Sequence, residues 1–132
     1  MNLVSIRLIT ADIDRLVEFY ERVTIATALR PTPDFAEITT AAGTLAIGSE
    51  RTVALFTPGS ARPAANHSAI IEFLVDDVDA EYARLTAIVT DFVNEPTTMP
   101  WGNRSLLFRD PDGNLVNFFT PVTAAAIAKF TR

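Results

Sequence analysis

Few side chains in this sequence of 132 residues could catalyse a reaction or bind a metal. The chain has one histidine, His67, and no cysteine. This excludes disulfides, thiolate metal sites, cysteine nucleophiles and any site that takes two imidazoles from one chain. There is no glycine-rich phosphate loop and no GxSxG motif. The remaining chemistry is that of carboxylates, hydroxyls, amides and arginine.

The charge balance limits the partners. Sixteen acidic and eleven basic residues give a net charge of -5, whereas nucleic-acid binding takes a concentrated excess of Lys and Arg. The longest uncharged run, 113–128, is shorter than the roughly 20 apolar residues of a membrane-spanning helix. No signal-peptide pattern precedes Arg15. We therefore expect a cytoplasmic protein without a nucleic-acid or membrane partner.

The first half of the chain predicts a strand, a helix and further strands. Apolar residues alternate over 4–9, as in a strand with one buried face. Asp12 is a suitable N-cap for the helix that follows. Apolar residues recur along this helix at i, i+3, i+4 and i+7: Ile13, Leu16, Val17 and Tyr20. Short β-rich runs follow at 25–30, 35–40, 44–47 and 52–56.

The same pattern begins again after a linker-like segment at 58–66. Apolar residues alternate over 69–75, Asp77 caps a second helix, and a shift of 65 residues lays Asp12 on Asp77. Further strands are expected near 92–94, 104–108 and 114–119. The repeat predicts an α+β fold with two βαβββ modules.

The predicted organisation is a single domain over 1–132. Its parts are module 1 at about 1–57, a linker at about 58–66, module 2 at about 67–121 and a C-terminal tail at 122–132. The Ala-rich tail predicts a short terminal helix.

Three motifs stand in order along nearly the whole chain. They are Asp12-Ile13-Asp14-Arg15 with Glu18-Phe19-Tyr20, then FLVDDVDA at 73–80, and Asp110-Pro111-Asp112-Gly113-Asn114. Together they resemble the vicinal oxygen chelate superfamily, which includes glyoxalase I, bleomycin resistance proteins and extradiol dioxygenases. The resemblance implies curled mixed sheets around a central cleft, commonly in a homodimer. It also implies that catalytic members hold a divalent metal there as a Lewis acid, through His, Gln or Glu.

The metal-ligand positions that the resemblance implies carry unsuitable side chains. They are Ser5 and Ile70 on the first strands, and Asn117 on the last strand. The counterpart of Asn117 by the shift of 65 is Thr52, or Ala54 if the strand is displaced by one pleat. Hard cations need carboxylates, and softer ones need imidazole or thiolate. We therefore predict no metal and no other cofactor.

Arg7 and Glu72 are also related by the shift of 65, and alternation puts them on the faces of Ser5 and Ile70. The resemblance turns these faces toward the cleft. One interpretation is a buried ion pair that fixes the packing of the modules. In the other, Arg7 binds an anionic ligand group, while Glu72 binds a cationic group or acts as a base.

Two other side chains admit two interpretations each. His67 is an exposed residue at a strand end, or a ligand or base. Trp101 is a packing anchor under a loop, or it lines the cleft and stacks on an aromatic ligand. The predicted ligand-binding residues are Ser5, Arg7, Thr52, Ile70, Glu72, Trp101, Arg104 and Asn117, and the catalytic candidates are Glu72 and His67. Core or cleft-wall residues are Phe56, Leu106, Phe108, Leu115 and Phe119.

The preferred prediction is a metal-free protein, similar to glyoxalases and bleomycin resistance proteins, that binds a small organic molecule such as an antibiotic in its cleft. The net charge of -5 would suit a cationic ligand. One alternative is a glyoxalase-like lyase, isomerase or dioxygenase with a displaced metal site, or a metal-free catalyst that uses Glu72 or His67. Another is an interaction module whose own side chains fill the cleft.

Overall fold

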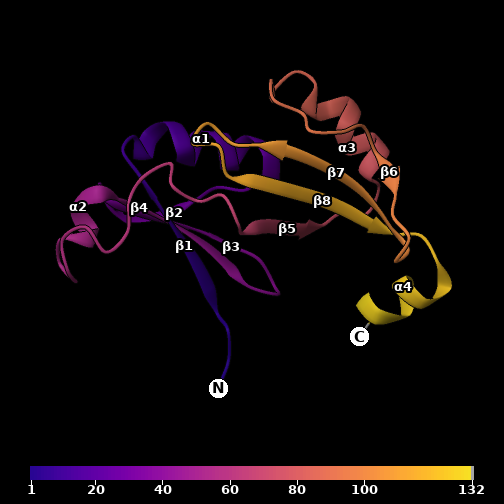
Figure 1. The fold of residues 1–132 in the computed structure, drawn as a ribbon, viewed down its shortest axis with the longest axis horizontal. Coiled ribbons are helices and arrows are strands. Elements are labelled where there is room, and N and C mark those ends of the chain that lie inside the picture. Colours follow the sequence, from indigo (N-terminus) through magenta and orange to yellow (C-terminus); the bar gives the residue numbers. More distant parts are fainter. Residues whose placement is uncertain (132) are drawn as a thin grey trace. The chain divides into compact units, whose positions relative to one another are not determined.

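The computed structural model describes residues 1–131. The chain divides into two compact units between Asn66 and His67. We call the unit that ends at Asn66 module 1, and the unit that begins at His67 module 2. Each has the order strand, helix and three strands (Figure 1). The predicted α+β fold with two βαβββ modules is therefore confirmed. Among the described residues, the longest helices fall well short of what a membrane crossing needs.

Module 1 is a four-stranded mixed sheet with the strand order β1-β4-β3-β2. Strands β1 and β4 are parallel, and the other neighbours are antiparallel. Its elements are β1 (Ser5–Thr10), α1 (Ile13–Thr24), β2 (Leu29–Thr32), β3 (Phe35–Thr39), β4 (Thr44–Ser49) and α2 (Glu50–Val53).

Helix α1 covers one face of this sheet. The Asp12 carboxylate accepts a hydrogen bond from the Arg15 backbone N–H at 3.2 Å, and this caps the helix. The helix ends at Thr24, and the residue after it, Ile25, has a left-handed φ of 53°. Its buried residues are Ile13, Leu16, Val17, Tyr20 and Val23. The buried apolar strand residues on the face toward α1 are Leu8, Ala36, Ile38, Leu45 and Ile47. Burial of each large aliphatic side chain contributes about 1.5–3 kcal/mol, so this layer is the core of module 1.

Module 2 repeats the topology with the strand order β5-β8-β7-β6, and β5 is parallel to β8. Its elements are β5 (Ile70–Leu74), α3 (Val78–Leu85), β6 (Thr97–Thr98), β7 (Asn103–Arg109), β8 (Leu115–Pro121) and α4 (Ala124–Phe130). The Asp77 carboxylate caps α3 by accepting from the Ala80 N–H at 3.2 Å. Helix α4 confirms the predicted terminal helix.

The core of module 2 is a chain of aromatic rings. The Phe118 ring lies 5.5 Å from the Phe73 ring and 5.2 Å from the Phe108 ring. The chain continues from Phe108 to Phe92 at 6.2 Å and from Phe92 to Tyr82 on α3 at 5.2 Å. All these contacts are edge-to-face, an arrangement that aromatic pairs favour.

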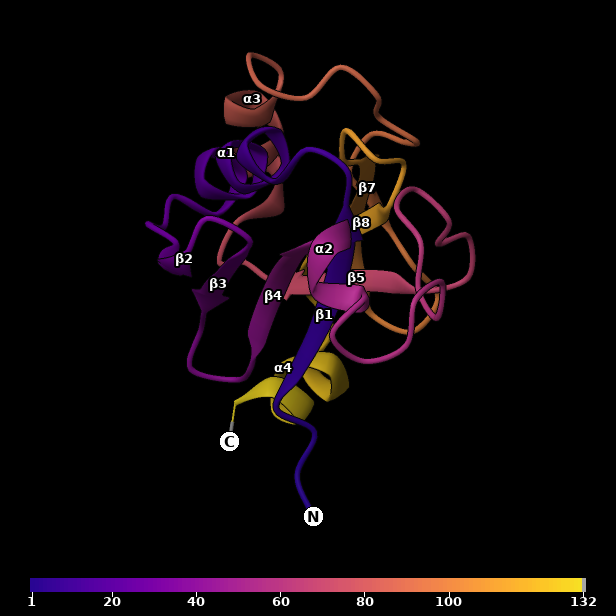
Figure 2. The ribbon, with the colours of Figure 1, turned by 90° about the vertical axis from the view of Figure 1, so that its left-hand side faces the viewer.

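The predicted strand at 52–56 is wrong. The chain leaves β4 directly into α2, and the Leu55 and Phe56 N–H groups bond to the Thr52 and Val53 carbonyls. The β-branched composition suggested a strand, but these residues have no strand beside them and instead bond locally, as a helical turn does. Figure 2 draws α2 over β1 and β4, and α2 makes close backbone approaches to both strands.

The predicted strand at 92–94 is also wrong, although the segment does run beside β7. Phe92 forms an isolated bridge with Phe108, and the Asn94 side-chain oxygen accepts the Leu107 N–H at 2.7 Å. A side chain here replaces one backbone partner, so no continuous ladder forms. The two-residue strand β6 at Thr97–Thr98 takes the edge position instead.

Candidate functional site

The sheet face away from α1 in module 1, and the face away from α3 in module 2, carry the charged candidates. We call these the distal faces. Side chains alternate along a strand, so Arg7 points away from the buried Leu8 on β1, and Glu72 points away from the buried Ile71 on β5. The faces predicted for Arg7 and Glu72 follow from this alternation.

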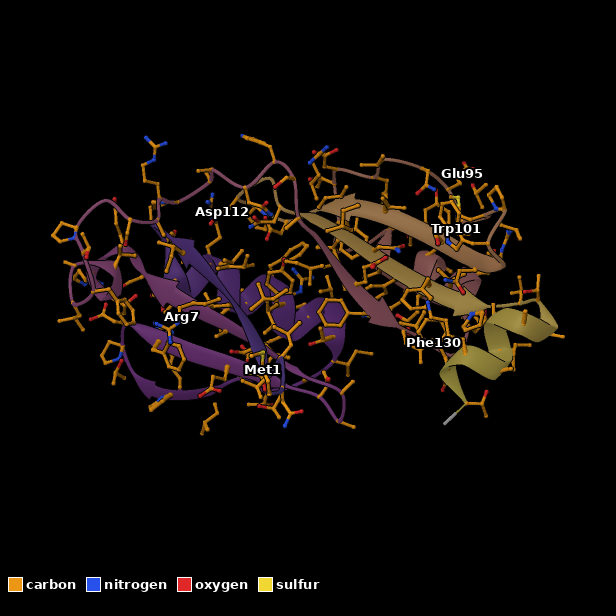
Figure 3. The ribbon with its side chains drawn as sticks, turned by 60° about the horizontal axis from the view of Figure 1, so that its bottom comes forward. Met1, Arg7, Glu95, Trp101, Asp112 and Phe130 are labelled. Carbon is orange, nitrogen blue, oxygen red and sulfur yellow. The ribbon has the colours of Figure 1, made fainter. Side chains whose placement is uncertain are left out.

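Arg7 lies among aromatic rings on the distal face of module 1. Its guanidinium carbon is 4.9 Å from the centre of the Phe35 ring and 5.7 Å from the centre of the Phe56 ring. Figure 3 labels Arg7 in this module. Arg7 is exposed, and its side chain makes no hydrogen bond or ion pair with a described residue of its own module. A cation over a ring is attracted by its π face, so these contacts orient Arg7 and leave its N–H donors available.

Gly48 allows α2 to approach this face. Gly48 lies opposite Ile9 on β1 and Phe35 on β3, and a Cβ atom at Gly48 would stand 2.9 Å from the Thr52 hydroxyl oxygen. The Thr52 hydroxyl donates to the Ser49 carbonyl at 2.7 Å. Because α2 is held this close, the turn that follows it carries Phe56 over Arg7.

An ion pair between Arg51 and Asp34 ties α2 to the residue just before β3. Asp34 accepts hydrogen bonds from the Ser49 hydroxyl at 2.8 Å and from Arg51 Nε at 2.8 Å. The hydrogen bond from Arg51, supported by that from Ser49, holds the pKa of Asp34 below its ordinary value of 3.8. The same carboxylate raises the pKa of Arg51. This pair positions the helix and does not point to ligand chemistry.

Glu72 and Asn117 form a hydrogen-bonded pair on the distal face of module 2. The two residues lie opposite one another on β5 and β8, and Asn117 Nδ2 donates to a Glu72 carboxylate oxygen at 2.8 Å. Asn117 is 8% exposed, and its side-chain oxygen has no hydrogen-bond partner within the described part of the chain. Glu72 itself is exposed. The amide therefore holds one oxygen of an accessible carboxylate.

The strand pairing corrects the predicted counterpart of Asn117. Asn117 lies opposite Glu72, and the residue opposite Arg7 is Ala46. Thr52 is in helix α2 and Ala54 follows it, so neither occupies the last strand of module 1. The shift of 65 fails here because the segments between helix and last strand differ in length. The ligand role of Thr52 stays a prediction without a strand position to support it.

The four positions that correspond to family metal ligands are therefore Ser5, Ala46, Ile70 and Asn117. One hydroxyl, one amide and two aliphatic side chains do not fit a divalent cation. Across residues 1–131, no three His, Asp or Glu side chains gather in a way that could hold a metal ion. These four positions therefore do not support a metal-dependent reaction.

Arg104 does not lie on a distal face. It alternates with Ser105 and shares the face of the buried Leu106, toward α3. Its guanidinium binds the Asp79 carboxylate through two hydrogen bonds of 2.8 and 3.0 Å. The hydrogen bond lowers the pKa of Asp79 and raises that of Arg104. Sequence reasoning placed Arg104 at the ligand site, but the structure gives it a partner at the start of a helix.

His67 and Trp101 both lie outside the sheets. His67 is exposed three residues before β5 begins, as one of its two interpretations proposed. Trp101 is 68% exposed in the turn before β7 (Figure 3). The packing-anchor interpretation of Trp101 is therefore wrong. The turn depends on Gly102, which has a φ of 96° and leaves no room for a Cβ atom beside Thr123.

Sequence reasoning missed two of the residues around Arg7. Phe35 shares the distal face with Arg7 through the pairing of β3 with β4, and period-two alternation along 35–40 could have indicated this. Phe56 was grouped with residues of the core or of the cleft wall, and because it is 73% exposed it does not belong to the core. Its contact with Arg7 depends on the helical turn that the sequence pattern did not reveal.

Two βαβββ modules with three motifs in register define the fold that the sequence resemblance implied. A model of the Glyoxalase/Bleomycin resistance protein/Dioxygenase superfamily matches residues 2–118. The chain belongs to this superfamily. A search of curated proteins finds no match.

Solved structures of the same fold are similar to this chain over nearly its whole length. A glyoxalase/bleomycin resistance protein/dioxygenase from Nocardioides has a TM-score of 0.77 and 23% identity, with 94% of this chain and 85% of that one covered. A family enzyme from Burkholderia phytofirmans has a TM-score of 0.81 and 18% identity, with 92% and 100% covered. TioX from Micromonospora sp. ML1 has a TM-score of 0.70 and 26% identity, with 92% and 100% covered.

Proposed function

We propose that this protein binds a small organic molecule without a metal and without catalysing a reaction. The observation that carries the proposal is the contrast between neighbouring positions on the distal faces. The positions of the family's metal ligands hold Ser5, Ala46, Ile70 and Asn117, whereas Arg7 and Glu72 beside them are charged and exposed. A sheet face without metal-binding side chains that carries an oriented, accessible charged group can bind a ligand group of opposite charge.

The polar groups would give the ligand its orientation, and the rings would provide contact area. Arg7 can donate to an anionic or carbonyl oxygen, and Glu72 can accept from an amine or hydroxyl. Each charged group already has a neighbour in its own module, namely the two rings at Arg7 and Asn117 at Glu72. These contacts favour ligand binding over the predicted buried ion pair between Arg7 and Glu72, which stays a prediction.

The superfamily name includes bleomycin resistance proteins, and this makes antibiotics reasonable compounds to test. A homodimer and a cytoplasmic location stay predictions. Light scattering would test the dimer as a particle with twice the chain mass of 14.4 kDa.

The metal-free proposal can be tested on protein purified without chelator. We expect elemental analysis to find less than about 0.1 equivalent of Fe, Ni, Zn or Mn, and divalent cations to leave the melting temperature unchanged. Antibiotics, aromatic acids and amines would then be screened by thermal shift, because a ligand that binds only the native state stabilises it by about 2.7 kcal/mol at 100 times its Kd. A stoichiometric metal, or a screen without any ligand, would contradict the proposal.

A second candidate function is metal-free catalysis with Glu72 as a general base. The observation that favours it is the exposed Glu72 carboxylate, one oxygen of which is held by Asn117. If a bound compound is turned over and Glu72→Gln abolishes turnover while Kd changes less than threefold, this function replaces simple binding.

A further inference from the structure

Arg7 offers a more specific conclusion about the ligand, which rests on the proposed function. We propose that the ligand is an aromatic carboxylate, with its carboxylate bound by Arg7 and its ring placed beside Phe35 and Phe56. The site lies within module 1 and uses β1, β3 and the turn after α2.

The contacts of Arg7 leave its hydrogen-bonding capacity unused. The two side chains that contact its guanidinium are rings, which interact with a guanidinium through their π faces and accept no conventional hydrogen bond. The five N–H donors of the guanidinium therefore have no acceptor among the described residues of module 1. Two other arginines of this chain, Arg51 and Arg104, bind carboxylates. Arg7 carries the same guanidinium donors, and no carboxylate of module 1 accepts from them.

The rings restrict Arg7 in a way that favours a planar ligand. An exposed arginine usually loses side-chain entropy on binding, but contacts with Phe35 and Phe56 already limit the positions that this side chain occupies. A guanidinium binds a carboxylate through two parallel hydrogen bonds in one plane. An aromatic acid keeps its carboxylate near the plane of its own ring, so the exposed Phe56 ring can stack on it.

Two charges oppose an anionic ligand. The net charge of -5 acts across the whole surface, but charges beyond about 8 Å are screened at physiological ionic strength. The nearer charge is that of Glu37. Arg7 on β1 and Glu37 on β3 both pair with Ala46, which lies between them on β4, so the two side chains share one face of the sheet. Glu37 forms no ion pair with Arg7, so this carboxylate does not neutralise Arg7.

The experiment compares three probes of the same shape and different charge, by isothermal titration and NMR. They are 2-naphthoate, neutral 2-naphthamide and cationic naphthalene-2-carboxamidine, and cyclohexanecarboxylate serves as an acid without an aromatic ring. We expect 2-naphthoate to bind at least tenfold more tightly than each of the others. Arg7→Gln should weaken naphthoate at least tenfold, and Arg7→Lys about threefold or more, because lysine keeps the charge and loses the two-point contact.

Two variants separate binding from a structural effect. Arg62→Gln removes the same charge from an exposed arginine of module 1 that contacts no ring among the described residues, and it should leave the naphthoate Kd unchanged. Phe56→Leu should weaken naphthoate severalfold and leave binding of cyclohexanecarboxylate unchanged. A chemical-shift spectrum of each variant confirms that it is folded.

The outcomes distinguish this inference from the function on which it rests. If naphthamide or the carboxamidine binds as tightly as naphthoate, or Arg7→Gln and Arg62→Gln have equal effects, the carboxylate inference is wrong and small-molecule binding stands. If the naphthoate series does not bind and the thermal-shift screen yields ligands but no aromatic acid among them, the carboxylate inference is likewise wrong and small-molecule binding stands. If no compound binds in either experiment, the proposed function itself is wrong.

Discussion

The two modules share a topology and differ at the same point of their distal faces. The last strand of each sheet is followed by a short helix that returns over that face. In module 1 the strand offers Gly48 at this point, and Thr52 of α2 approaches it closely. In module 2 the equivalent position, opposite Leu74, is Phe119, whose ring packs 5.2 Å from that of Phe130 on α4.

This difference decides what each face can offer a ligand. In module 1, Gly48 on β4 has no side chain. The Arg7 Cδ atom lies 3.6 Å from where a Cβ atom of residue 48 would be, and the Arg7 guanidinium contacts two rings. Where Phe119 occupies the space, the charged group is Glu72, held from the side by Asn117. A single backbone plan thus supports an arginine among rings in one module and a carboxylate beside an amide in the other.

The largest expected effect comes from removing the central ring of the module 2 core. Phe118 is 2% exposed and contacts both Phe73 and Phe108. We expect Phe118→Ala to cost about 3–5 kcal/mol of unfolding free energy because a cavity remains. Urea denaturation followed by fluorescence of Trp101 would measure it, since the only tryptophan lies in module 2. A cost below about 1.5 kcal/mol would show that the aromatic chain is not central.

A side chain at Gly48 should make module 1 resemble module 2 and disturb its charged site. The added methyl of Gly48→Ala would lie 2.9 Å from the Thr52 hydroxyl. We expect a loss of about 1–3 kcal/mol in urea denaturation, the usual cost of overpacking. Adding Thr52→Ala should recover most of this loss. If the double variant is no more stable than Gly48→Ala, the close approach of α2 is not the cause.

Substitutions of Asn117 test whether its hydrogen bond with Glu72 stabilises module 2. Its buried side-chain oxygen has no partner among residues 1–131, and such an atom carries an unrecovered desolvation cost. We therefore expect Asn117→Leu to change the unfolding free energy by less than about 1 kcal/mol, whereas Asn117→Asp should lower it at pH 7 by placing a second carboxylate beside Glu72. The deficit of the aspartate variant should shrink at acid pH. A large loss with leucine would mean that the Glu72 to Asn117 hydrogen bond is a stabilising contact.

The smallest effect concerns the ion pairs at the helix starts, Asp34 with Arg51 in module 1 and Asp79 with Arg104 in module 2. Each arginine lowers the pKa of its partner below 3.8. This stabilisation is therefore complete above that value and is lost as the pH falls through the lowered pKa. Asp34→Asn and Asp79→Asn should be less stable than wild type at pH 7 and should approach it at acid pH in denaturation curves. A constant difference across pH would contradict this.

Added salt provides the control for the same comparison, because both pairs are exposed at the surface. Screening weakens such pairs, so 1 M NaCl should reduce the deficits of both variants at pH 7. A deficit that salt leaves unchanged would indicate a loss of packing rather than of charge.

The sequence predicted the elements that depend on local signals. The N-caps Asp12 and Asp77, the alternation on β1 and β5, and the Ala-rich tail each correspond to structure at the expected place. The failures at 52–56 and 92–94 are segments where β-branched or aromatic residues lack a full strand partner. Strand propensity reflects how well a side chain fits a half-buried sheet. It does not reveal whether a second strand lies beside the segment to pair with it.

The sequence by itself determined the two modules, the superfamily and the faces of Arg7 and Glu72, because periodicity and capping act within a few residues along the chain. Only the tertiary structure decided that Ala46 is the counterpart of Asn117, that Arg104 binds Asp79, and that Phe35 and Phe56 flank Arg7. These contacts depend on strand register and on where α2 turns back. Both are set by pairing between segments distant in the sequence, and no local pattern encodes them.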